Sequence, residues 1–331
     1  MLGILVFSGY SIDVEVSLMI EGQNGLTWDR WIHILALAER LKFPSVFRSD
    51  HYFVRDRQQD SLEAYLSFVL AARETTTLRF GPLVTPITFR NPVNVARMAA
   101  QLDVLSGGRF VMGLGAGWNE SEHHAYGLNF PPAKERYDRL EEAIQLSKIL
   151  WREEQATFQG RYYHIESVTS LPRPSQLSIP ILVGGVGEYR TLGLAAKYAD
   201  EWNAVTVTLE DYERKRDIFE DHCAALGRDP ASVRRSMMVF GIVGHSLKDL
   251  DILTKQIMPV FGADIEGSPN EFRKNMKDRG VFSGLTSEVI DQLGMFANLG
   301  LDEMIFQHVV YDSDEIPEYL AAEISPQVAK L

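Results

Sequence analysis

The sequence predicts an α/β fold, a (β/α)8 or TIM barrel that carries insertions. Strand-like and helix-like segments alternate from about residue 13 to the C-terminal end, and eight such strand–helix units follow one another. Eight units in this order are typical of a parallel barrel whose helices surround its strands. Glycine-rich or polar stretches follow several expected strands, which is where ligands bind in such folds. A doubly wound open sheet with an extra domain is the alternative architecture.

In the first half of the chain, apolar periodicity and capping residues define four strands and three helices. Residues 14–20 form the first expected strand. Thr27 then suits a helix N-cap, because its hydroxyl oxygen can accept a backbone N–H of the first turn. The other expected elements are a helix with the apolar face Trp31, Ile34, Leu35, Ala38 and Leu41, a strand over 45–48, a helix from the capping-box pair Asp60 and Glu63 to Ala72, a strand over 79–85, a helix over 91–105 and a strand over 109–114.

The second half continues the alternation through four more strands. A long helix presents an apolar face that includes Tyr137, Leu140, Ile144 and Trp151. The last helix stops at Gly300, a suitable C-cap because glycine tolerates the left-handed conformation there. The expected elements after the long helix are a strand over 181–183, a helix over 190–198, strands over 202–205 and 237–243, a helix over 287–299 and a strand over 304–308.

The chain has 331 residues, more than the ~250 that a barrel typically needs. We expect the surplus in two insertions within a single domain that spans residues 1–331. Residues 157–165 read as a hairpin that turns at Gln159-Gly160, and residues 245–285 form a long, polar insertion between strands seven and eight. Residues 1–12 precede the first strand and are treated as an N-terminal extension, either an extra strand at the barrel bottom or an upstream start.

Composition excludes several classes of partner. The formal net charge of -12 argues against nucleic acid, because phosphate binding needs a basic patch. No apolar run approaches the ~18 residues of a membrane span, and we expect no signal peptide. The single cysteine, Cys223, excludes an intrachain disulfide and a cysteine-rich zinc site, and its helical context indicates a packed thiol. The cytoplasm is therefore the expected compartment.

Residues that follow the expected strands are rich in amides, glycines and aromatic rings. Gly115 and Gly117 follow the fourth strand and remove side chains there, so a large, flat group could approach the backbone. A planar polar ring held by hydrogen bonds and stacking suits such a set. The other residues of this kind are Glu21, Gln23 and Asn24 after strand one, Trp118, Asn119 and Glu120 after strand four, Glu201, Trp202 and Asn203 at strand six, and Gln307 and His308 at strand eight.

Asp50-His51, after strand two, is the best acid–base candidate. A histidine of near-neutral pKa can move a proton, and an adjacent carboxylate can steer it. A capped loop with a partly buried histidine is the equally weighted structural interpretation. His123 and His124 are adjacent, so they do not form the i, i+4 pair of a zinc helix, and we expect no metal. Glu122, His123 and Tyr126 are interpreted as either substrate-loop or plain surface residues.

The run Gly184-Gly185-Val186-Gly187 opens a helix, where free N–H groups and the helix dipole suit a phosphate. Strand-to-helix turns of this composition are common, so the run alone is a weak signal. It matches neither the G-x-G-x-x-G spacing of dinucleotide sites nor the Gly-Lys-Ser/Thr ending of a P-loop.

Several segments together resemble the bacterial luciferase-like monooxygenase superfamily, most closely its branch that uses the deazaflavin coenzyme F420. The resemblance covers roughly residues 15–307, and its segments are specific in combination rather than singly. They are MIEGQNGLTW (19–28), FRSDHYF (47–53), FGPLVTPITFRNPV (80–93), LDVLSGGRFVMGLGAGWNESEH (102–123), PPAKERYDRLEEA (131–143), TFQGRYYHI (157–165), LPRPSQ (171–176) and IPILVGGVGEYRTLGLAAKYADEWN (179–203).

This resemblance implies a TIM barrel whose carboxyl-end mouth holds the cofactor ring. His51, preceded by Asp50, matches the family's histidine beside the ring, and Leu83-Val84 matches a non-proline cis peptide that presses on the ring. The remaining positions matched to cofactor binding are Asn119, which falls near the family's Asn after strand four, Gly184, Gly185 and Val186 in the phosphate loop, and Tyr137, where some members offer a side chain towards the phosphate. The family often dimerises through helices beside the barrel, which implies a homodimer.

One departure bears on the substrate. Sugar-phosphate dehydrogenases of this branch carry a catalytic Glu directly after the strand-four glycines, where this chain has Trp118. A sugar-phosphate role is therefore disfavoured. The phosphate loop also lacks the Ser often seen in FMN-binding members, which favours the deazaflavin. Glu21, Trp118 and Trp202 are expected to shape the substrate pocket.

The resulting hypothesis is an oxidoreductase that transfers a hydride between coenzyme F420 and a small organic substrate, with His51 handling a proton. An FMN-dependent monooxygenase that uses reduced flavin and oxygen is the alternative within enzymes. A non-catalytic flavin-binding barrel is the alternative from another class, and His51 counts against it. A cofactor-free barrel acting on a sugar would need paired carboxylates in one pocket, for which Glu21 and Glu201 are the obvious pair.

Overall fold

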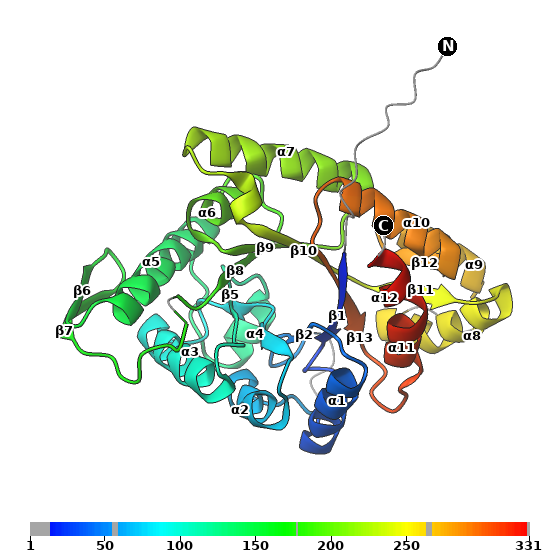
Figure 1. The fold of residues 1–331 in the computed structure, drawn as a ribbon, viewed down its shortest axis with the longest axis horizontal. Helices are drawn as coiled ribbons and strands as arrows, with labels where there is room; N and C mark the ends of the chain where they lie inside the picture. The colour runs from blue at the N-terminus through cyan, green and yellow to red at the C-terminus, as the bar shows by residue number, and fades with distance from the viewer. Residues whose placement is uncertain (1–13, 55–58, 177, 263–266, 330–331) are drawn as a thin grey trace, which may run out of the picture.

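A computed structural model describes residues 14–54, 59–176, 178–262 and 267–329 of the chain. Nine parallel strands follow the order β3-β2-β1-β13-β10-β9-β8-β5-β4, and outer helices surround them (Figure 1). Phe80 of β3 and Phe110 form a further bridge that brings the two ends of this sheet together. The predicted TIM barrel is therefore confirmed. The strands are β1 Glu15–Ile20, β2 Ser45–Arg48, β3 Arg79–Pro82, β4 Thr85–Pro86, β5 Met112–Gly115, β8 Ile181–Gly184, β9 Glu201–Val205, β10 Arg234–Val239 and β13 Glu303–His308.

Six helices of the outer layer lie where the sequence predicted them, and further helices follow β9 and β13. Thr27 caps the first of them, and its side chain accepts from the backbone N–H of Arg30. The second begins differently from the prediction: Glu63, not Asp60, is its N-cap, because the Glu63 carboxylate accepts the N–H of Leu66 at 2.8 Å. The layer contains α1 Trp28–Arg40, α2 Ala64–Glu74, α3 Pro92–Ser106, α5 Ala133–Arg152, α6 Thr191–Tyr198, α7 Leu209–Ala225 and α10 Thr286–Asn298, and α11 Glu315–Tyr319 and α12 Ser325–Val328 end the chain.

Two strands predicted as continuous are interrupted. The third divides into β3 and β4 at the Leu83–Val84 peptide, which is cis, as the family resemblance implied. The seventh ends at Val239, and after Phe240 the chain continues as β11 (Gly241–Gly244), which leaves the barrel and pairs with β12 (Phe282–Leu285).

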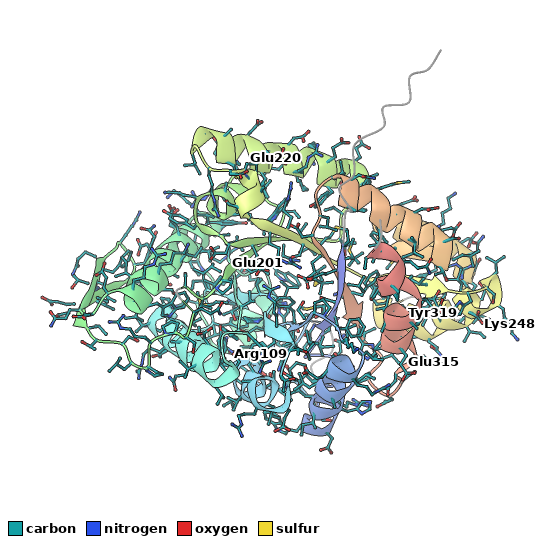
Figure 2. All side chains as sticks on the ribbon, in the orientation of Figure 1. Arg109, Glu201, Glu220, Lys248, Glu315 and Tyr319 are labelled. Carbon is teal, nitrogen blue, oxygen red and sulfur yellow. The ribbon has the colours of Figure 1, made fainter. Side chains whose placement is uncertain are left out.

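The expected insertion after strand seven forms a lobe around the β11–β12 pair, built from α8 (Leu247–Ile257), α9 (Pro269–Lys277) and a 3-10 turn over Met258–Phe261. Figure 1 shows this lobe at one side of the barrel, and Figure 2 shows Lys248 at its outer edge. The predicted hairpin is confirmed as β6 (Ala156–Gln159) and β7 (His164–Val168), paired antiparallel. Residues 1–12, interpreted as an extension, lie outside the described part of the chain.

Side chains alternate between the two faces of each barrel strand, and each face has its own core. Leu18 and Ile20 belong to the large core between strands and helices, whereas Met19 belongs to a small core inside the barrel. The other buried residues of this inner core are Phe47, Leu83, Val111, Leu182 and Ile305. The inner layer fills the barrel below its mouth, and the large cavity lies above it at the carboxyl ends of the strands.

The amino ends of the strands hold a buried polar cluster. Glu303 is fully buried, accepts hydrogen bonds from Ser17 and Ser45, and lies 3.3 Å from Arg234. Glu201 begins β9 at this same end and pairs with Arg79, and burial raises the pKa of its carboxyl although Arg79 opposes the rise. Figure 2 places Glu201 beside the central strands. It is therefore at the opposite end of the barrel from Glu21, and the two carboxylates do not share a pocket as the cofactor-free sugar enzyme requires.

Candidate functional site

A cavity of about 950 Å³ lies at the carboxyl ends of the barrel strands. This is the end at which barrels of this class carry their sites. Nine of the residues predicted for the site line it, namely Glu21, His51, Leu83, Val84, Trp118, Tyr137, Gly184, Gly185 and Val186. Asp50, Asn119 and Trp202 do not line it.

Val84 projects between two glycine-containing strands. A Cβ atom placed on Gly115 would lie 2.6 Å from one Val84 methyl group, and a Cβ on Gly184 would lie 2.7 Å from the other. A Cβ on Gly113 would contact the carbonyl oxygen of Pro82 and lie 3.3 Å from Val84. Glycine at positions 115 and 184 leaves room for the valine, and glycine at position 113 leaves room for the Pro82 backbone. Gly115, which the sequence suggested would let a flat group approach, therefore first accommodates Val84, whereas Gly117 faces Thr88 and Pro86 instead.

His51 is held by a buried carboxylate. Its Nδ1 lies 2.9 Å from Oε2 of Glu122, whose other oxygen accepts the backbone N–H groups of Tyr52 and Phe53. Glu122 has no exposed surface and belongs to the short helix α4 (Glu120–Ala125). Because Glu122 occupies Nδ1, Nε2 is the ring nitrogen of His51 that is left for chemistry in the cavity.

The surroundings of His51 favour its protonated form. Burial alone would lower the pKa of the imidazole, but the hydrogen bond and negative charge of Glu122, with smaller contributions from Glu21 and Asp50, raise it above its usual value. Trp118 covers the imidazole edge-on at 5.5 Å between ring centroids and is itself 65% exposed. The site thus contains a histidine whose orientation and charge are set by Glu122.

A second group in the cavity is the Glu21 carboxylate. The side-chain amide of Gln23 donates to it at 2.8 Å, and the amide of Gln307 donates to its other oxygen. The hydroxyl of Tyr311 donates to the Glu21 backbone carbonyl oxygen at 2.5 Å. The carboxylate is therefore fixed in position at the end of β1.

The glycine loop lies at the N-terminus of α6. Gly185 has a φ of 126°, a conformation that other residues rarely adopt. The hydroxyl groups of Tyr137 and Thr191 lie 3.0 Å apart beside it, and a Cβ on Gly187 would lie 2.9 Å from the Thr191 oxygen. Within the described part of the chain, the N–H groups of Val186 and Gly187 make no hydrogen bond. Free N–H groups, two hydroxyls and a helix N-terminus together suit a phosphate group.

Trp202 has a different place from the pocket wall predicted for it. Its ring is fully buried on the outer face of β9, stacked on Tyr212 and Phe219 of α7, and its indole N–H donates to the Gly185 carbonyl oxygen at 2.9 Å. It therefore supports the glycine loop from behind. The next residue, Asn203, has the opposite orientation and lines the cavity.

Asp50 and Asn119 also lie away from the cavity. The Asp50 carboxylate accepts from Thr85 at 2.8 Å and from two nitrogens of Arg90, so it does not hold His51. The side-chain amide of Asn119 donates to the Phe53 carbonyl oxygen at 3.1 Å and fixes the loop next to His51. Neither side chain lines the cavity, so the direct steering and cofactor contacts predicted for them do not match where the structure places them.

Sequence reasoning left several site residues without a role. Glu122 was interpreted as loop or surface, and its pairing with His51 joins positions 71 residues apart with no local pattern to indicate it. Thr191 had a detectable signal, since it is the first residue of the helix that the glycine run opens. The apolar residues that the sequence did not assign to the cavity include Met238, Phe240, Pro259, Phe261 and Val309.

Neither a metal centre nor a membrane span is found in the described residues. No group of three or more His, Cys, Asp or Glu side chains there could hold a metal ion. No helix among the described segments has the length and apolarity needed to cross a membrane.

Two relatives and one solved structure show what this chain is similar to. An F420-dependent hydroxymycolic acid dehydrogenase of Mycobacterium tuberculosis is 33% identical over 218 residues, which cover 65% of this chain and 59% of that protein. An F420-dependent glucose-6-phosphate dehydrogenase of Intrasporangium calvum is 39% identical over 166 residues, 49% of this chain and 48% of that protein. The matches thus span between about half and three fifths of these relatives.

Similarity of structure extends over almost the whole chain. An F420-dependent secondary alcohol dehydrogenase, solved with an F420–acetone adduct, superposes with a TM-score of 0.76 at 21% identity and covers 96% of this chain and 99% of its own. The model of the luciferase-like monooxygenase family matches residues 8–315. With this match and the barrel on which the cavity is built, the chain belongs to the luciferase-like monooxygenase family.

Proposed function

We propose that this protein is an oxidoreductase that binds the deazaflavin coenzyme F420 in the cavity and exchanges a hydride with a small organic substrate. The observation that carries the proposal is the combination, in one cavity, of the Leu83-Val84 wall, the glycine loop and the Glu122-held His51. The names of both relatives and of the superposed alcohol dehydrogenase support F420 as the cofactor.

The residues present fit such a cofactor. Val84, seated among glycines, gives the cavity an apolar wall against which a planar ring can lie. The free N–H groups of Val186 and Gly187 and the hydroxyls of Tyr137 and Thr191 would hold a phosphate. The bound deazaflavin supplies the hydride chemistry, and the protein supplies orientation and proton handling.

His51 is proposed as the catalytic residue of this chain. Its Nε2 would accept the proton of an alcohol hydroxyl during oxidation, or donate one to a carbonyl oxygen during reduction. Glu122 acts through His51 as a positioning residue, because it fixes the ring and favours a proton on Nδ1. Asp50 is hydrogen-bonded to Thr85 and paired with Arg90, and we propose that it supports the His51–Glu122 pair without contacting the substrate.

Titration of the purified protein with F420 and separately with FMN, followed by quenching of each cofactor's fluorescence, tests the proposal. Micromolar binding of the deazaflavin, with FMN at least tenfold weaker, is the expected result. Tight binding of FMN instead would move the protein to the monooxygenase alternative, which oxygen consumption during turnover then checks. Binding of neither would contradict the proposal and revive a barrel without a cofactor.

Three further proposals concern the whole protein. We propose that residues 1–331 form one domain, that the protein acts in the cytoplasm and that it forms a homodimer. The single, buried Cys223 supports a reducing compartment, and the family resemblance supports the dimer. Light scattering on the purified protein distinguishes a dimer from a 37.4 kDa monomer.

A further inference from the structure

We propose that the substrate is an uncharged alcohol or carbonyl compound with an apolar substituent, and that Glu21 excludes anionic analogues. This inference rests on the proposed function, since it names the substrate class for the same cavity. It is carried by the charges and the apolar side chains that the cavity presents.

The ionisable side chains among the described lining residues are few. They are Glu21, His51 and Tyr137, and no lysine or arginine of the described part of the chain lines the cavity. The His51 imidazole already faces the Glu122 carboxylate at 2.9 Å, so its protonated form is paired. Beside His51, a carboxylate or phosphate on a substrate would therefore meet no unpaired cation among the described lining residues, and its desolvation would be costly.

The fixed position of Glu21 adds repulsion to this cost. Two side-chain amides, from Gln23 and Gln307, donate to its oxygens and leave the carboxylate little freedom to turn away from a ligand. Both of these partners are neutral amides, so neither brings a positive charge to the carboxylate. A second anion placed near it would meet a like charge in a partly desolvated cavity, and such contacts discriminate strongly between ligands.

The cationic side chains near the glycine loop already form ion pairs with carboxylates that do not line the cavity. Arg190 pairs with Asp138, and Lys215 lies 3.2 Å from Glu188 and donates to the Val186 carbonyl oxygen. These pairs surround the place proposed for the cofactor phosphate rather than the space beside His51. They do not offer a second anion site to the substrate.

The side lobe supplies an apolar end to the cavity. Phe240 and Phe261 pack edge to face at 5.0 Å, and Pro259, Phe261 and Val309 line the cavity with Trp118. The lobe's own core holds Phe240 in place. A substrate whose hydroxyl or carbonyl meets His51 can therefore bury a hydrocarbon substituent against this surface, which favours binding in proportion to the apolar area removed from water.

Calorimetric binding of two probes with eight carbons each, 2-octanol and octanoate, tests the proposal at pH 8. The cofactor-saturated protein and the protein alone are both titrated. We expect 2-octanol to bind at least about tenfold more tightly than octanoate. Equal or tighter binding of octanoate would show that a cation serves the cavity, and binding of neither probe would exclude the apolar substrate class; either result overturns the proposal.

The Glu21→Gln variant isolates the contribution of the carboxylate. It keeps the size of the side chain and removes the charge, so the preference for 2-octanol over octanoate should shrink severalfold. Glu74→Gln, an exposed change at the end of α2, alters the net charge equally and should leave the preference as in the wild type. An unchanged preference in Glu21→Gln would refute the role of Glu21. Failure of F420 to bind would overturn the proposed function alone, because the probes report on the cavity without turnover.

Discussion

Glu122 Oε2 lies 2.9 Å from Nδ1 of His51, and this pair joins the loop after β2 to the helix after β5. The carboxylate is fully buried, and its second oxygen binds the backbone of the residues that follow His51. The arrangement fixes both the direction of the imidazole and the nitrogen that carries its proton. His51 and Glu122 therefore form one functional unit, whose parts respond differently to substitution.

The first prediction concerns Glu122→Gln. The amide keeps an acceptor for the backbone N–H groups but removes the charge that raises the pKa of His51. We expect turnover to fall by roughly tenfold to a hundredfold, by analogy with the range seen when the partners of metal-ligating histidines are altered. The acidic limb of the pH–rate profile for alcohol oxidation should also move to lower pH, because the His51 pKa falls towards its ordinary value.

Glu120→Gln is the matched control for this variant. It lies two residues earlier on the same short helix and is exposed, so it changes the charge without touching His51. Its rate and pH profile should match the wild type. A Glu122→Gln profile with unchanged pH dependence would show that the carboxylate has only a structural role.

The second prediction concerns His51→Ala. Removal of the imidazole should reduce turnover by on the order of a hundredfold or more if it acts as a general acid or base. Binding of F420 should change by no more than severalfold, because the glycine loop and the Val84 wall are untouched. Steady-state rates and fluorescence titration measure the two quantities separately. Unchanged turnover would remove His51 from the mechanism.

The third prediction concerns Gly115→Ala. The new methyl group would lie 2.6 Å from a Val84 methyl, closer than carbon atoms approach in proteins, so Val84 must shift. We expect cofactor binding to weaken by about tenfold, and Val84→Ala in the same chain to restore part of the loss, because it relieves the overlap. Gly193→Ala is the control, since its Cβ would make only an ordinary contact at 3.7 Å with His222. Equal affinities for F420 in Gly115→Ala and the wild type would contradict the role of Val84.

Much of the fold could be predicted because each barrel strand and its helix leave a local pattern. The interruptions could not, since they depend on contacts between distant segments. The third strand breaks where Val84 occupies the space left by Gly115 and Gly184. The seventh leaves the barrel after Val239, because β11 pairs with β12, some forty residues further along the chain. Neither contact has a signature in the interrupted strand itself.

The alternation of side chains along a strand explains which predicted site residues line the cavity and which do not. Successive residues of an extended segment face opposite sides, so a residue next to a cavity residue usually points away from the cavity. His51, Asn203 and Gln307 face inwards, whereas their neighbours Asp50, Trp202 and His308 do not line the cavity. The sequence identified the correct strand ends, but proximity along the chain misplaced Asp50 and Trp202. Counting by two from Met19, an inner-core residue, would have selected Glu21 and Gln23.

The last prediction concerns His308, which faces away from the cavity at the end of β13. Burial lowers the pKa of its imidazole to about 4, and its Nδ1 has no hydrogen-bonding partner among the described residues. The unfolded chain, with an ordinary pKa of about 6.5, binds this proton more readily than the folded one. Stability from this residue is therefore complete above pH ~6.5 and is lost as the pH falls towards 4, with a slope set by the difference in bound protons.

Urea unfolding at pH 7 and pH 5 measures this contribution. Between these two values His308 should cost the wild type about 2 kcal/mol of its free energy of unfolding. His308→Gln cannot take up the proton, so its loss of stability over the same interval should be smaller by about that amount, even though the substitution also alters packing at pH 7. His164→Gln, an exposed position in β7, should follow the wild type at both pH values. If His308→Gln and the wild type lose equal stability, the imidazole has the same pKa in the folded and unfolded chain, which contradicts the prediction.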